Sequence, residues 1–238
     1  MPTAEPILLL ATTAAVAVAH TLLGPDHYLP FVAMARARRW PRAKTIRITL
    51  LCGLGHVAGS VLLGFVGVGL GLSLASLSEL ESLRGSLAAW ALILFGLVYA
   101  AWGIRAAMRN ERHSHVHSHA DGSSHLHEHD HHANHLHVHE SGVFDGVTSW
   151  ALFSAFVLGP CEPLLPMMLY PAAAGSAAQI AAVVAVFTAF TLATMVGTVL
   201  LAIAGVDRVG PLPGARFAHV IAGLLVCGCG VAIRFAGL

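Results

Sequence analysis

Long apolar stretches alternate with short polar segments along the 238-residue chain. Six of them reach or nearly reach the roughly 20 residues that an α-helix needs to cross a bilayer. They cover about residues 7–35, 48–72, 87–107, 147–169, 179–204 and 217–235. The pattern therefore predicts an all-α polytopic membrane protein with six transmembrane helices.

Composition supports this class and excludes a water-soluble one. Apolar residues make up 56% of the chain and charged residues only 11%, whereas roughly a quarter of the residues are charged in a soluble domain. A net charge of +1 gives no reason to expect a nucleic-acid partner. Four cysteines, three of them in apolar stretches, are interpreted as free thiols.

The positive charges predict the orientation of the chain. All Lys and Arg residues except Arg84 and Arg234 fall in three segments, 36–47, 105–112 and 208–216. Cytoplasmic loops are enriched in Lys and Arg. We therefore expect the three basic segments in the cytoplasm and both termini outside, in a bacterial or archaeal cell membrane.

Matching strings in the two halves indicate an internal repeat. The matching segments are 24–30 with 159–166, 59–63 with 197–201, and 96–103 with 223–230. An odd number of helices per copy places two copies in opposite orientations. We predict two inverted three-helix repeats, 1–108 and 147–238, around a histidine-rich loop, 109–146, with helices one and four broken at Gly-Pro. Chance similarity among Gly, Val and Leu is the alternative.

Polar side chains at membrane depth are the candidate site. His20, Asp26 and His27 stand in HTLLGPDH, and His56 stands in LGHVAGS. An ionisable group in a membrane helix is costly unless it has a partner, so its default interpretation is functional. Imidazoles with one carboxylate suit nickel, cobalt, zinc or iron better than magnesium or calcium.

The spacing of these residues leaves two questions open. His20 and His27 would lie roughly 10.5 Å apart along a regular helix, so either the Gly24-Pro25 break shortens that distance or His20 serves a neighbouring site. Asp26 either ligates directly or orients a histidine.

The second half contributes two further candidates at the matching break. Cys161 and Glu162 occupy the positions of Asp26 and His27 in the repeat. Glu162 is the expected second carboxylate. Cys161 is either a soft ligand or a small packing residue. Proline at 25 and 160 should also free carbonyls near Thr21 and Phe156, which then need a polar cavity.

HTLLGPDH, LGHVAGS and LGPCEP resemble the nickel/cobalt transporter superfamily, the NicO and NiCoT groups with urease-accessory-type permeases and RcnA-type efflux proteins. The resemblance covers all six spans. It implies a transporter, not an enzyme, in which His20, Asp26, His27 and His56 select and pass nickel or cobalt without a permanently bound cofactor. The family signature has four residues between its histidine and Asp-His, whereas this chain has five.

Two other functions are alternatives. LGPCEP also resembles the membrane part of thiol-disulfide carriers of the DsbD and CcdA type, although the first-half counterpart of Cys161 is Asp26 rather than a second cysteine. A metal-sensing membrane protein without transport is the other alternative. No GxxxxGK[ST] string is present, so a transporter of this sequence would use an ion gradient or act passively.

Twelve histidines gather between the third and fourth apolar stretches. They are His113, His115, His117, His119, His125, His127, His129, His131, His132, His135, His137 and His139. We expect a disordered cytoplasmic loop that binds divalent ions, with pH sensing as the alternative. Its position slightly favours efflux over uptake. The expected partners are membrane lipid and a divalent metal ion, with a second copy of the chain or a cytoplasmic metallochaperone as candidate protein partners.

Overall fold

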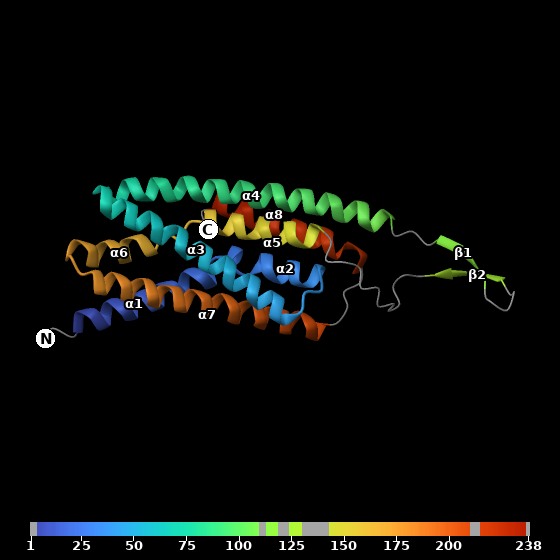
Figure 1. Cartoon of the computed structure of the whole chain (residues 1–238), viewed down its shortest axis with the longest axis horizontal. Helices are drawn as coiled ribbons and strands as arrows, with labels where there is room; N and C mark the ends of the chain where they lie inside the picture. The colour runs from blue at the N-terminus through green and yellow to red at the C-terminus, as the bar shows by residue number, and fades with distance from the viewer. Residues whose placement is uncertain (1–3, 110–112, 119–123, 130–142, 210–214, 237–238) are drawn as a thin grey trace.

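The computed structural model describes residues 4–109, 113–118, 124–129, 143–209 and 215–236. Within them the chain forms eight α-helices that lie side by side in one bundle, and one β-ribbon (Figure 1). Five helices are long and apolar enough to cross a bilayer. They are α1 (Ala4–Leu23), α3 (Arg42–Leu70), α4 (Leu74–Arg109), α7 (Ala177–Val209) and α8 (Ala218–Ala236). The chain is therefore a helical integral membrane protein.

The first apolar stretch is broken where the sequence predicts. Helix α1 ends at Leu23, a 3-10 turn η1 (Pro25–His27) follows, and α2 (Leu29–Ala37) continues beyond it. The Gly24 amide still donates to the His20 carbonyl at 3.0 Å, but Pro25 has no amide hydrogen to continue the ladder. Gly24 takes an extended conformation instead, with φ −87° and ψ 98°.

The fourth apolar stretch is broken in the same way, into two short helices. These are α5 (Val143–Leu158) and α6 (Leu164–Ala173), with Gly159 and Pro160 between them. With 16 and 10 residues, neither is long enough to cross a bilayer by itself. The two breaks explain why eight helices form where six apolar stretches were counted.

The third span begins earlier than predicted. The apolar stretch was placed at 87–107, but α4 begins at Leu74 after Gly71, whose φ of 64° ends α3 in the left-handed conformation. The Ser73 hydroxyl accepts a hydrogen bond from the Ser76 amide at 3.2 Å and caps α4. Glu81 and Arg84 therefore lie within α4, whereas the predicted span at 87–107 would have left both residues in the segment before it.

Helix α4 packs along α8 through glycines that bring the two backbones together. A Cβ atom on Gly96 would lie 2.5 Å from the Gly223 carbonyl oxygen, and one on Gly223 would lie 2.6 Å from the Gly96 carbonyl oxygen. Further along, Gly103 faces Val220 and Gly230 faces Ile93. Early residues of α4 thus meet late residues of α8, so the two helices are antiparallel.

Among the other helices, α1 packs with α7, α2 with α8, α3 with α5 and α6 with α7. Large apolar side chains such as Leu23, Leu70 and Leu201 point outward, each at least 70% exposed. In a membrane protein such a surface contacts lipid. Inside, one apolar cluster collects residues of α2 and α5, including Phe31 and Phe156, and a second collects residues of α1 and α6.

Part of the histidine-rich segment forms an antiparallel ribbon, β1 (His113–Ser118) with β2 (Ser124–His129), beyond the end of α4 (Figure 1). In its register His113 is opposite His129, His115 opposite His127, and His117 opposite His125. The sequence analysis expected a disordered loop here, and the alternating histidines of these two segments match the two-residue period of a strand. The remaining six loop histidines lie outside the described residues.

Candidate metal site

Three histidines from three elements meet inside the bundle. His20 is in the last turn of α1, His27 ends η1, and His56 lies in the middle of α3. One ring nitrogen from each lies within 4.8 Å of the others. The ring centroids are 4.7 Å apart for His20 and His27, 5.1 Å for His27 and His56, and 6.2 Å for His20 and His56. We call these three residues the histidine cluster.

The first break produces this convergence. On a continuous helix, His20 and His27 would be separated by roughly 10.5 Å along the axis. The extended Gly24 and the turn at η1 place the His27 ring against the His20 ring instead. The expectation that the break shortens this distance is confirmed, and His20 belongs to the same cluster as His27.

Asp26 lies against His27. Its Oδ1 is 3.3 Å from His27 Nδ1, and the Gly24 carbonyl oxygen is 3.1 Å from the same nitrogen. The Gly24 carbonyl as acceptor at Nδ1, with the Asp26 carboxylate nearby, favours the tautomer that carries its hydrogen there, which leaves the lone pair on Nε2. This contact fits an orienting role for Asp26, while its Oδ1 has no hydrogen-bond partner among the described residues.

The cluster nitrogens are available to a ligand. His27 Nε2 and both ring nitrogens of His56 have no hydrogen-bond partner among the described residues. Both residues are only 2% exposed, and a buried polar atom without a partner costs free energy. A borderline transition-metal cation that accepts imidazole lone pairs would remove this cost.

Cys161 and Glu162 take different places at the second break. Cys161 is fully buried, with its Sγ 3.9 Å from His20 Nε2. Glu162 is exposed and does not belong to the histidine cluster. The structure thus brings Cys161 to the edge of the cluster, and leaves Glu162 on the wall of the cavity described next.

A cavity of about 630 Å³ leads to the cluster. Its wall includes His20, Asp26, His27, Glu162, Ser86 and Arg234. The Asp26 side chain is 19% exposed, against 3% for His27. A hydrated cation in the cavity would therefore meet carboxylates first and the buried imidazoles behind them.

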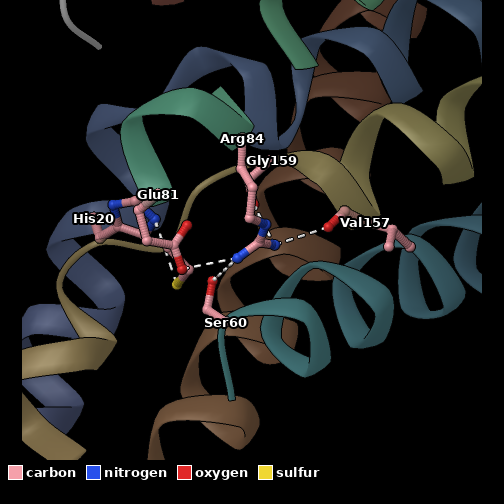
Figure 2. Close-up of polar contacts among 7 residues, drawn as sticks. His20, Ser60, Glu81, Arg84, Val157 and Gly159 are labelled. Carbon is pink, nitrogen blue, oxygen red and sulfur yellow. Dashed lines mark hydrogen bonds and ion pairs between the residues drawn. The ribbon is translucent and has the colours of Figure 1, made fainter. Parts of the chain in front are cut away.

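A partly buried ion pair that was not predicted from the sequence lies beside the site. Arg84 Nη1 donates to Glu81 Oε1 at 2.8 Å and to Ser60 Oγ at 3.2 Å, while Nη2 donates to the carbonyl oxygens of Val157 at 2.9 Å and Gly159 at 3.3 Å (Figure 2). Glu81 is fully buried, so Asp26 and Glu162 are not the only acids within the spans. The i,i+3 spacing of Glu81 and Arg84 is the signal that could have found the pair.

The carbonyls freed at the second break also differ from the expectation. The Phe156 carbonyl accepts a hydrogen bond from the Gly159 amide at 3.0 Å, so it is not free. Val157 and Gly159 carry the carbonyls that need a donor, and Arg84 supplies it. His219, the remaining histidine of the helical part, lies outside the cluster, with its Nδ1 2.8 Å from the Tyr99 hydroxyl.

Comparisons of the chain with protein-family models, with curated proteins and with solved structures give no match.

Proposed function

We propose that this chain carries a divalent transition-metal cation, nickel or cobalt, across the membrane through the histidine cluster. The observation that carries the proposal is the meeting of three imidazoles inside a membrane bundle, with nitrogens that have no partner among the described residues. Such groups are costly in a membrane interior unless they have a function. The cavity beside Asp26 gives an ion a route to them.

The donor set supports the choice of metal. Imidazole nitrogen suits nickel, cobalt, zinc and iron, whereas magnesium and calcium prefer oxygen ligands. Nickel and cobalt are preferred within this group because of the family that HTLLGPDH, LGHVAGS and LGPCEP resemble. The metal is the cargo in this proposal, not a resident cofactor.

An inverted repeat of two three-helix units is part of the same proposal. Two observations support it. Gly103 faces Val220 and Gly230 faces Ile93, which are the same contact after a shift of 127 residues between the halves. The pairing of α1 with α7 also becomes the pairing of α5–α6 with α3 when the halves are exchanged. A two-fold arrangement places a site between the two broken helices.

Export is the direction that we favour. The basic segments favour a cytoplasmic position for the histidine-rich segment, where it would collect metal before transport. We also propose that a cytoplasmic metallochaperone delivers the metal and that the chain assembles with a second copy of itself.

Radioactive nickel flux in proteoliposomes tests the function. We expect the full-length chain to transport, and His27→Ala and Asp26→Ala each to abolish flux, since the first removes a ligand and the second removes its orienting carboxylate. His219→Ala is the matched control, because it removes a membrane histidine outside the cluster. Normal transport by the Asp26 or His27 variant would refute the site assignment.

The same assay separates the alternatives. A metal sensor would bind nickel without flux. A thiol-disulfide carrier would show no nickel flux and would form a functional disulfide at Cys161, which mass spectrometry detects. Either result for the full-length chain would contradict transport.

A further inference from the structure

Arg84 joins three parts of the bundle at the second break. Its guanidinium contacts Ser60 on α3, Glu81 on its own helix α4, and the carbonyls of Val157 and Gly159 at the end of α5 (Figure 2). Gly59 makes this approach possible, since a Cβ there would lie 2.4 Å from Arg84 Nη2. The sequence therefore provides both the side chain and the space for it.

The contacts of Arg84 replace the hydrogen-bond donors that the break after α5 removes. The last carbonyls of a helix have no intrahelical donor, and inside a membrane water does not replace one. Pro160 brings no amide hydrogen of its own. The planar guanidinium offers several N–H groups in a fixed geometry, so one side chain satisfies two carbonyls and a carboxylate together.

The same contacts lie beside the histidine cluster. Cys161, two residues after Gly159, places its Sγ 3.9 Å from His20 Nε2 (Figure 2). On the other side, a Cβ on Gly159 would lie 3.0 Å from His56 Nδ1. A displacement of residues 157–161 would therefore alter the surroundings of two of the three histidines.

We propose that Arg84 is a positioning residue that fixes the α5–α6 break against α3 and α4, and so holds Cys161 against His20 and Gly159 against His56. Glu81 pairs with Arg84 and compensates its positive charge, which would otherwise repel an arriving cation. The importance of the position of the α5–α6 break for metal transport rests on the proposed function. That Arg84 holds the break in this position does not depend on transport, and it is tested without metal.

Alkylation of Cys161 reports the position of the break without any metal. In the full-length chain in liposomes, N-ethylmaleimide labelling of Cys161 and of Cys52 is followed by mass spectrometry. Both thiols are buried, but Cys161 is flanked by two cavity-wall residues, Pro160 and Glu162. We expect Arg84→Ala to accelerate labelling of Cys161 roughly tenfold through local opening, and to leave Cys52 protected. Labelling of Cys161 at the wild-type rate in Arg84→Ala would overturn the proposal.

A second variant, Arg84→Lys, tests the positioning role if Arg84→Ala unfolds the chain and exposes both thiols. Arg84→Lys keeps the positive charge beside Glu81, but a single ammonium lacks the fork that spans both carbonyls and Ser60. We expect it to label at Cys161 faster than wild type, with Cys52 protected. Labelling of Arg84→Lys at the wild-type rate would overturn the positioning role. Arg105→Ala, an exposed position on the same helix, is the control.

Transport kinetics test the charge compensation by Glu81. Glu81→Gln leaves the guanidinium without its carboxylate, so we expect the KM for nickel to rise roughly tenfold with a smaller change in maximal rate. Glu79→Gln, an exposed neighbour on α4, should match wild type. A wild-type KM for Glu81→Gln would refute the compensation.

Discussion

Gly24 shapes the site because it has no side chain. A Cβ at this position would lie 2.5 Å from His27 Nδ1 and 2.8 Å from Asp26 Oδ1. Its backbone angles, φ −87° and ψ 98°, are open to any residue. The requirement for glycine therefore comes from the approach of the Asp26 and His27 side chains, not from backbone conformation.

We expect Gly24→Ala to displace His27 from His20 and His56 and to raise the KM for nickel roughly tenfold, equivalent to about 1.4 kcal/mol of binding. Flux measured over a range of nickel concentrations gives this value. Gly197→Ala is the matched control, since a Cβ there meets no atom within 4 Å. Equal KM values for the two variants would show that His27 does not need the space at Gly24.

Residue types alone identified most of the candidate site. His20, His27 and His56 stood out because imidazoles are rare at membrane depth, and the structure brings all three together. Arg84 did not stand out, because its role depends on Ser60, Val157 and Gly159, which are distant in the sequence. Contacts of this kind follow from helix packing, which no local pattern contains.

At the scale of elements, the contact between α4 and α8 depends on backbone approach. The Cβ of an alanine at 96 would lie 2.5 Å from both the Cys227 amide nitrogen and the Gly223 carbonyl oxygen. Backbone atoms cannot rotate away as a side chain does, so the helices must separate to admit the methyl group.

Gly96→Ala should therefore lower the free energy of unfolding by about 1–3 kcal/mol, the usual cost of overpacking. Thermal unfolding in detergent, followed by circular dichroism, measures the change as a lower Tm. Gly228→Ala on α8 meets no atom within 4 Å and should leave the Tm unchanged or raise it, because alanine favours a helix over glycine. An unchanged Tm for Gly96→Ala would contradict the tight backbone contact.

The apolar pattern predicted the helices better than their ends. Both Gly-Pro breaks were visible, because proline and glycine interrupt a helix for local reasons. The start of α4 was not visible, because Glu81 and Arg84 lower the local hydropathy and only their pairing allows Glu81 to be buried. The β-ribbon was missed because composition was weighed above the two-residue period of its histidines.

At the scale of the whole molecule, the histidine-rich segment and the histidine cluster are separate in the chain. Deletion of 113–139 should leave maximal nickel flux in place and reduce flux mainly at low metal concentration, because the cluster is built entirely from residues before 57. Flux against nickel concentration in proteoliposomes checks this. Loss of all flux in a deletion variant that unfolds at the wild-type temperature would show that the segment is part of the pathway.

The glycine contacts between α4 and α8 also determine which parts of the molecule can move. Sliding or rotation of one helix on the other would drive Gly96 or Gly230 into the opposite main chain, so α4 and α8 must travel as one rigid body. The chain lacks a continuous hydrogen-bond ladder at 24–28 and can bend there, whereas Arg84 ties the α5–α6 break to α4 and α2 packs along α8. A cycle that opens the histidines first to one side of the membrane and then to the other would therefore move α1 against a stationary body that contains α2, α4 and α8.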